Sequence, residues 1–311
     1  MTQDMTLPQC IDWTAFDALQ SDPERWRAVI TAIAAPYALA HAPAPVRPTT
    51  AGSVLVALVG QALVVKLYPP LLRDHFEFER EALSRLHGLL GVPTPRLVDA
   101  GQRDGWPYLV MTQLAGASLL DTWPTLDEAH KCSVLRAIGK LAAEVHALAP
   151  GSLCALAPDW PVFLENQRKH CLQRQQRTGL PAHLLAGLEA FIGGEVPAGP
   201  AVILTGEYTP MNLLHGPGGI AGMYDFGDGL VGPREYDWLG PLCFLAAGHA
   251  PRREAFLAGY GATPGPGWPA LRLRLLRLLL LHRYSALRAQ IAHVGWQRAE
   301  SFEALAETIW P

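Results

Sequence analysis

The chain has 311 residues, of which half are apolar and 17% are charged, and its formal net charge is −3. This length is enough for one large domain or for two packed lobes with a sizeable core. The near balance of charges excludes a surface dominated by polyanion binding, so we expect no nucleic-acid partner.

The cysteines and the apolar segments argue against a secreted or membrane protein. The five cysteines form no C-x-x-C pair, which indicates neither a zinc site nor a disulfide framework. Residues 1–13 contain no apolar stretch of signal-peptide length. The most apolar segment, residues 271–281, is interrupted by three arginines, which favours a buried helix over a membrane span or a helix on a membrane surface. We therefore expect a cytoplasmic protein that does not contact a membrane; its oligomeric state is left open.

Residues 1–45 are predicted to form a helical extension followed by a linker. Trp13, Phe16, Trp26 and Ile30 recur at loosely helical spacing, whereas the Pro/Ala-rich piece 42–48 cannot continue a helix.

Residues 46–113 are predicted to form a small lobe of mixed sheet and helix. Two β-like runs, 53–59 and 61–68, are separated by Gly60, and a helical pattern covers residues 74–86. Two further strands are expected near 96–100 and 108–112, on either side of a turn-prone segment. The order is therefore β-β-α-β-β.

Residues 114–311 are predicted to form a larger, mainly helical lobe. The helix-compatible segments are 126–148, 160–177, 181–193, 235–247, 251–260, 269–290 and 295–309. The exception is a strand-rich stretch, residues 202–226, which contains most of the candidate functional residues.

This stretch predicts a hairpin whose open end collects oxygen ligands. The strand that begins at Asn212 turns at 216–219 and returns to Asp225. In an antiparallel hairpin these two residues should meet, with Glu207 on the adjoining loop. An amide oxygen and carboxylates are ligands of the kind that Mg²⁺ takes, and phosphoryl transfer needs such a metal beside a carboxylate that accepts the substrate proton.

Three motifs in this region resemble those of aminoglycoside phosphotransferases and choline kinase-like small-molecule kinases. Residues 205–212, TGEYTPMN, resemble the H-G-D-x-x-x-x-N catalytic loop of that family. Residues 225–229, DFGDG, look like its metal-binding D-F-G-D segment, and residues 232–237, GPREYD, are similar to its G-x-x-x-Y-D element. The resemblance covers roughly residues 50–311.

The resemblance also assigns roles to residues upstream. Lys66, one of four lysines against 21 arginines, would hold the α- and β-phosphates of ATP. Glu81 on the following helix is the preferred partner for that lysine, with Glu77 and Glu79 as alternatives. Residues 111–116 resemble the hinge between the lobes, where Gln113 and Leu114 would offer backbone hydrogen bonds to adenine.

Other residues leave choices open. Glu207 stands where the family has its catalytic Asp, and Thr205 where the family has His, so a catalytically weak or inactive nucleotide-binding module is the alternative to an active enzyme. Asp228 is either an auxiliary carboxylate beside the metal or a turn former. The resemblance implies that Asp237 braces the catalytic loop, and His146 is expected to pack on its helix.

The resemblance therefore implies a two-lobed, α+β, protein-kinase-like fold with ATP between the lobes. Asn212 and Asp225 would bind Mg²⁺, and Glu207 would orient and deprotonate a hydroxyl of a small molecule. From residue 115 onward the sequence contains 17 acidic and 16 basic residues. The larger lobe therefore has no marked acidic excess that would indicate a polycationic aminoglycoside as the acceptor.

Overall fold

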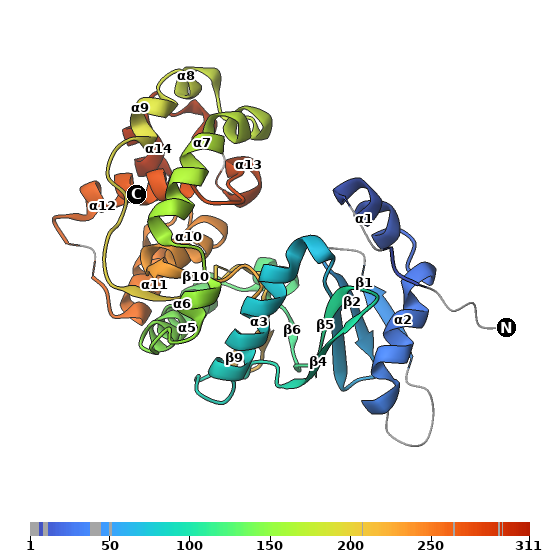
Figure 1. Cartoon of the computed structure of the whole chain (residues 1–311). Coiled ribbons are helices and arrows are strands. Elements are labelled where there is room, and N and C mark those ends of the chain that lie inside the picture. The colour runs from blue at the N-terminus through green and yellow to red at the C-terminus, as the bar shows by residue number, and fades with distance from the viewer. Residues whose placement is uncertain are drawn as a thin grey trace. The chain divides into compact units, whose positions relative to one another are not determined.

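The computed structural model describes residues 6–8, 12–37, 45–49, 52–206, 208–263, 265–291, 293 and 295–311. The chain forms two compact units (Figure 1). Unit 1 contains residues 1–89 and 93–115, and unit 2 contains residues 90–92 and 116–311. The first 37 residues, predicted as an extension, therefore belong to unit 1, and most of the predicted linker, 38–44, lies outside the described residues.

Unit 1 is built on a five-stranded antiparallel sheet with the order β1-β2-β3-β5-β4. The strands are β1 (Val46–Thr49), β2 (Leu55–Val59), β3 (Leu63–Leu67), β4 (Leu97–Arg103) and β5 (Trp106–Thr112). The four predicted strands and the helix between the second and third of them are confirmed, but one further strand, β1, precedes them. Strand β1 was missed because its Pro48 lies in a Pro-rich piece, but β1 is an edge strand, where proline is tolerated.

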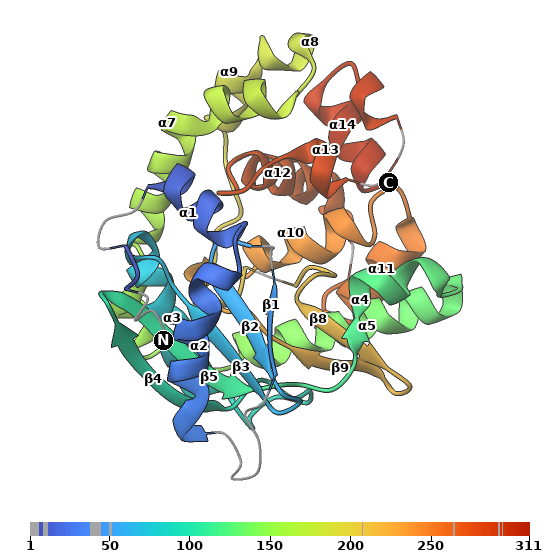
Figure 2. The ribbon, with the colours of Figure 1, turned by 90° about the vertical axis from the view of Figure 1, so that its right-hand side faces the viewer.

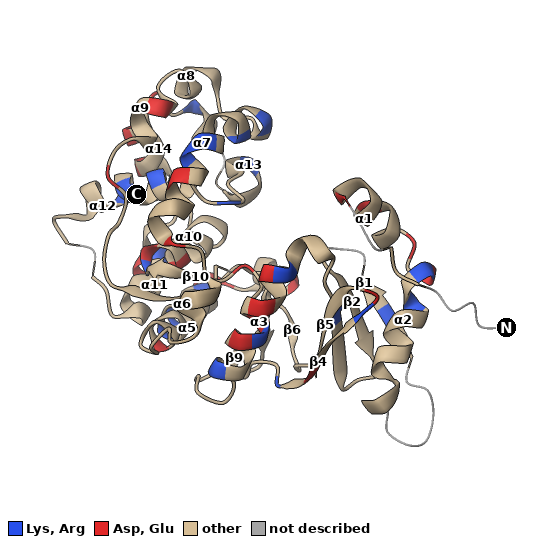
Figure 3. Cartoon of the chain, in the orientation of Figure 1, with Lys and Arg blue, Asp and Glu red and all other residues tan. Residues whose placement is uncertain are grey.

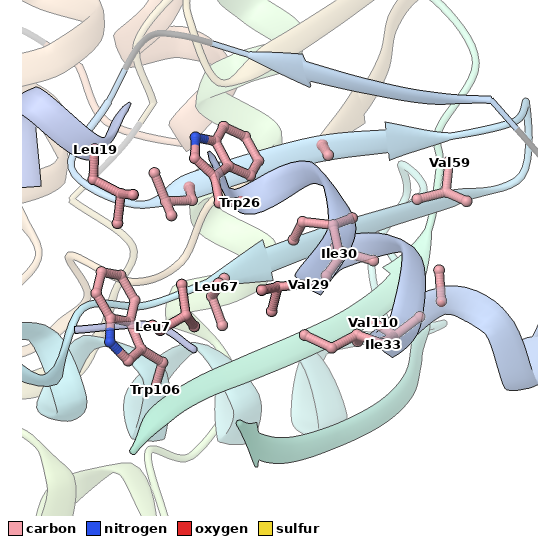
Figure 4. Packing of buried hydrophobic residues seen from close by; sticks show 14 of the residues in the cluster. Leu7, Leu19, Trp26, Val29, Ile30, Ile33, Val59, Leu67, Trp106 and Val110 are labelled. Atoms are coloured by element: carbon pink, nitrogen blue, oxygen red, sulfur yellow. The ribbon is translucent and has the colours of Figure 1, made fainter. Parts of the chain in front are cut away.

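Helices cover both faces of this sheet (Figure 1). They are α1 (Trp13–Gln20), α2 (Glu24–Ala34) and α3 (Arg73–Leu86), with short 3₁₀ turns at Ala35–Tyr37 and Pro70–Leu72. On one face, side chains from α1 and α2 such as Leu19, Trp26 and Ile30 pack with Leu67 and Val110 of the sheet (Figure 4). Because side chains alternate along a strand, Lys66, next to Leu67, points to the opposite face, which α3 covers.

Unit 2 is mainly helical, as expected. Its α-helices are α4 (Leu119–Thr122), α5 (Glu128–His146), α6 (Leu153–Leu156), α7 (Trp160–Thr178), α8 (Ala182–Leu185), α9 (Leu188–Ile192), α10 (Glu235–Phe244), α11 (Ala250–Tyr260), α12 (Trp268–Leu280), α13 (Leu287–Gln290) and α14 (Phe302–Ile309), with 3₁₀ turns at Trp123–Thr125 and Trp296–Arg298. None of the helices in the described part of the chain is long and apolar enough to cross a membrane.

Two small antiparallel sheets interrupt these helices. Strands β8 (Leu213–Gly216) and β9 (Gly219–Met223) form the predicted hairpin, and β6 (Ala117–Ser118) pairs with β8. Strand β7 (Ala201–Leu204) pairs with β10 (Leu230–Pro233), which was not predicted. Together these strands frame the loop 205–212 and the segment 224–229.

The helix predicted over 269–290 is wrong in its second half, because α12 ends at Leu280. The Leu280 carbonyl oxygen accepts hydrogen bonds from side chains of Cys171, Arg174 and Gln175, all on α7. The last carbonyl groups of a helix have no partner within that helix, and here side-chain donors from α7 supply one. The separate helix predicted over 181–193 is likewise divided into α8 and α9.

Helices α5 and α11 lie side by side in unit 2 (Figures 1 and 2) and cross at two glycines. A Cβ added at Gly139 of α5 would stand 2.1 Å from the Phe256 carbonyl oxygen, and one at Gly259 of α11 would stand 2.0 Å from the Arg136 carbonyl oxygen. The backbones therefore approach closely, which fixes the position of His146 at the end of α5.

Candidate functional site

In unit 1, Lys66 is fixed by a buried carboxylate. Its Nζ lies 2.6 Å from Glu79 Oε2, Glu79 is fully buried, and the Tyr68 hydroxyl also donates to the same oxygen. Burial removes both the ammonium and the carboxylate from water, so each charge depends on attraction to the other for its stabilisation. The pair therefore holds the lysine head in one position on the α3 side of the sheet.

The preference for Glu81 as the partner of Lys66 is wrong, and the alternative Glu79 is correct. Two residues correspond to about 200° around a helix, so Glu79 and Glu81 point in nearly opposite directions. Glu79 follows Phe76 by three residues and precedes Leu83 by four, so it lies within the apolar stripe that faces the sheet. The position of Glu79 within this apolar stripe is the sequence signal that identifies it as the partner of Lys66.

The segment that resembles a hinge is partly tied to the sheet. The Gln113 N–H donates to the Ala62 carbonyl oxygen at 2.8 Å, so this donor is already used within unit 1. The prediction that Gln113 and Leu114 bind adenine can therefore rely only on the Gln113 carbonyl and on the backbone of Leu114. The adenine contacts themselves stay a prediction.

In unit 2, the register of the β8–β9 hairpin places Asn212 and Asp225 at the same open end. Leu213 pairs with Met223, and the Tyr224 N–H donates to the Asn212 carbonyl oxygen at 3.1 Å. Asp225 is the next residue, and its φ of 69° lies in the left-handed region. A non-glycine residue pays roughly 1–2 kcal/mol for that conformation, and such strained positions cluster at functional sites.

The loop that leads to this hairpin is braced by Asp237. Its carboxylate accepts hydrogen bonds from the backbone N–H groups of Thr205, at 3.0 Å, and Gly206, at 2.7 Å. Asp237 is buried on α10 and also contacts His146 Nε2 at 3.0 Å. The bracing role predicted for Asp237 is confirmed, and it fixes the two residues that precede Glu207; Glu207 itself lies outside the described residues.

His146 has a structural role, as expected. Its Nδ1 lies 2.9 Å from the Tyr260 hydroxyl on α11, and its Nε2 contacts Asp237. Both ring nitrogens are therefore engaged. The histidine orients the carboxylate that holds the loop.

Asp228 is anchored by residues that the sequence did not single out. Its Oδ1 lies 2.6 Å from the Tyr284 hydroxyl and 3.4 Å from Arg283 Nη1. Burial and the neighbouring Asp228 raise the pKa of Tyr284, so the phenol stays protonated and donates. These contacts join residues about 55 positions apart in the chain. A local sequence pattern cannot predict a contact over that separation.

Asp228 also adjoins the braced loop through its backbone. Its carbonyl oxygen lies 3.1 Å from the place where a Cβ would stand on Gly206, which has a φ of 71°. Only glycine fits this left-handed, crowded position without strain. The turn that carries Asp228 therefore packs directly against the residue before Glu207.

With this geometry in place, comparison with known proteins assigns the family. The family model described as "Phosphotransferase enzyme family" matches residues 50–274. A search of curated protein sequences gives no match.

Solved structures show the same fold at low sequence identity. The GDP complex of wild-type aminoglycoside 2'-phosphotransferase-IIIa is 16% identical with a TM-score of 0.65, and the match covers 90% of this chain and 97% of that one. Macrolide 2'-phosphotransferase from Brachybacterium faecium is 20% identical with a TM-score of 0.58, covering 91% and 98%. An aminoglycoside phosphotransferase from Streptomyces rimosus is 19% identical with a TM-score of 0.59, covering 82% and 98%.

These matches confirm the predicted α+β, protein-kinase-like fold, with one unit built on an antiparallel sheet and a larger, mainly helical one. The family match spans well over half of the chain and includes the braced loop and the hairpin. The chain therefore belongs to the phosphotransferase enzyme family.

Proposed function

We propose that the protein transfers the γ-phosphoryl group of ATP to a hydroxyl of a small molecule, with Mg²⁺ held by Asn212 and Asp225. The observation that carries the proposal is the hairpin register, which brings these two residues to one end beside a loop braced by Asp237. Family membership supports the reaction class. One solved neighbour is a streptomycin–ATP ternary complex, which supports ATP as the donor.

The donor set fits magnesium. An amide oxygen and a carboxylate are hard ligands, and Mg²⁺ usually takes one or two carboxylates and completes its shell with water and phosphate oxygens. The chemistry that Mg²⁺ supplies here is neutralisation of charge on the phosphate oxygens.

The protein's own groups would bind, orient and move a proton. Lys66, held by Glu79, would contact phosphate oxygens of ATP. The carboxylate of Glu207 would accept the proton of the acceptor hydroxyl, whose oxygen bonds to the γ-phosphorus. The bond from that phosphorus to the bridging oxygen breaks, and ADP leaves. Asp237 fixes the backbone N–H groups of Thr205 and Gly206, the two residues that precede Glu207 in the chain.

The test is ADP release with Mg²⁺-ATP over a panel of alcohols that includes aminoglycosides, macrolides, sugars, choline-like alcohols and homoserine. Asp225→Asn should lower turnover at least 100-fold, because a metal ligand loses its charge. Asp17→Asn, a change at an exposed carboxylate on α1, should leave turnover unchanged. Full activity of Asp225→Asn would refute the metal assignment. Binding of Mg²⁺-ATP without turnover on any alcohol would instead favour the nucleotide-binding module.

A further inference from the structure

A pocket of about 480 Å³ lies within unit 2, next to the loop 205–212. The residues that line it include Leu120 and Trp123, Pro210 of the loop, and Phe244 and Leu245 at the end of α10. Its size lies in the range that takes a small organic molecule. Leu120 is half exposed, unlike most large apolar side chains of this unit, so the apolar wall is accessible.

The pocket shares a wall with the loop that carries the expected catalytic residues. The Leu120 N–H donates to the Pro210 carbonyl oxygen at 2.9 Å, which ties the start of α4 to the loop. Consecutive Cα atoms are about 3.8 Å apart, so the Cα of Pro210 lies at most about 7.6 Å from that of Asn212. A molecule seated against Pro210 can therefore extend a hydroxyl towards the start of the hairpin.

The polar lining does not suit a polycation. The polar side chains are His249, Arg252 and His293, and none of the described residues that line the pocket is Asp or Glu. Elsewhere in unit 2, acidic and basic side chains are interspersed along the chain (Figure 3), so the absence of Asp and Glu is specific to the described lining of this pocket. Ammonium groups that enter would lose hydration, and the side chains that line the pocket offer no carboxylate in exchange.

Arg252, which lines the pocket, is paired with the carboxylate of Glu128. Two guanidinium nitrogens of Arg252 contact Glu128 at 2.9 and 2.5 Å, and the hydrogen bond from Arg252 lowers the pKa of Glu128 to about 2. The same guanidinium lies 5.5 Å from the centre of the Trp123 ring. Arg252 therefore holds Trp123 in place, and its charge is balanced within the protein.

Resting on the proposed function, we propose that this pocket binds the body of the phosphoryl acceptor, and that the acceptor is an alcohol with an uncharged, apolar ring system rather than a polycationic aminoglycoside. The aromatic and aliphatic walls supply the affinity through burial of apolar surface. The wall at Pro210 positions the hydroxyl.

Direct binding tests this assignment independently of turnover. The probes are 2-(2-naphthyl)ethanol, an uncharged aryl alcohol, and kanamycin, a polycation, each titrated calorimetrically without nucleotide. Leu120→Glu places a charge in the apolar wall and should weaken binding of the naphthyl alcohol at least tenfold. The control Val162→Glu changes a similarly exposed apolar residue on α7 and should have no effect. Thermal unfolding of both variants checks that they fold.

The outcomes separate the pocket from the reaction. Wild-type protein that binds kanamycin more tightly than the naphthyl alcohol, or binds neither at millimolar concentration, overturns the pocket assignment. An equal loss in Leu120→Glu and Val162→Glu overturns it as well. If the naphthyl alcohol binds as expected but is never phosphorylated, the pocket assignment stands and the proposed reaction fails for this class. If it is phosphorylated with the same KM in wild type and Leu120→Glu, the reaction stands and the pocket assignment fails.

Discussion

Lys66 and Glu79 form a buried ion pair whose two members have different roles. Lys66 is the residue expected to contact phosphate, whereas Glu79 contacts the lysine and the hydroxyl of Tyr68. Removal of one partner from a buried pair leaves the other charge without compensation, which is far more costly than loss of an exposed pair. The two glutamates of α3 therefore offer a matched comparison.

We expect Glu79→Gln to lower the free energy of unfolding by about 3–5 kcal/mol and to raise the KM for ATP, because Lys66 loses its counter-charge. Glu81→Gln makes the same chemical change on the other side of the helix and should cost less than about 1 kcal/mol. Urea unfolding and steady-state kinetics of both variants measure this difference. Equal effects of the two changes would contradict the pairing.

At the scale of single residues, the sequence predicted those site residues whose positions are set by neighbouring segments of the chain. The hairpin with Asn212 and Asp225 at its end follows from a turn between two short strands, and the structure contains that hairpin. The preference for Glu81 was wrong because the angular position on the helix decides which of the three glutamates faces the sheet, and that residue is Glu79. The link from Tyr284 to Asp228 could not be predicted, because it depends on how distant segments pack.

Helices α5 and α11 show how close packing of elements supports the site. Their crossing depends on Gly139 and Gly259, and α5 ends at His146, which orients the carboxylate of Asp237. The position of the braced loop therefore depends on a helix crossing that contains no catalytic group. Helix existence was predictable from composition, but this crossing was not, since a glycine inside a helix pattern does not reveal which backbone it approaches.

Gly139→Ala should destabilise the protein by about 1–3 kcal/mol, although the same change in an exposed helix stabilises by roughly 0.5–1 kcal/mol. The reversal of sign arises because the new Cβ would overlap the Phe256 carbonyl oxygen and force α5 and α11 apart. The control Gly199→Ala has no atom within 4 Å of the added carbon and should change stability by less than about 0.5 kcal/mol. Thermal unfolding of the two variants is the measurement. A stabilised Gly139→Ala would show that the crossing is looser than described.

For the whole molecule, the division into a sheet-based part and a helical part was predictable because hydrophobic period and strand length change near residue 114. The packing of the helices within the first 37 residues against the sheet was not predictable. Trp26 and Ile30 pack on the sheet together with Leu67, so what resembles an appendage in the sequence completes the core of unit 1. Packing between distant segments is invisible to local periodicity.

The response of the whole fold to acid can be argued from His282, where segments far apart in sequence meet. Its ring stacks on Tyr236 at 4.6 Å, and burial, with smaller contributions from Arg283 and Arg174, lowers its pKa to about 3. The folded protein keeps this imidazole neutral, whereas the unfolded chain binds a proton near the ordinary pKa of about 6.5. Between these two values the unfolded state holds more protons, so the free energy of unfolding falls as the pH falls, by at most about 1.4 kcal/mol per pH unit from this group.

We therefore expect wild-type protein to lose stability between about pH 6.5 and pH 4 more steeply than His282→Gln, which cannot be protonated. Above pH 7 the two curves should run parallel, because the histidine is then neutral in both the folded and the unfolded state. His170→Gln, a change at an exposed histidine on α7, is the control and should follow the slope of wild type. Urea unfolding at half-unit steps of pH measures the slopes. If His282→Gln and His170→Gln showed the same slope in acid, His282 would not be the group whose protonation opposes folding.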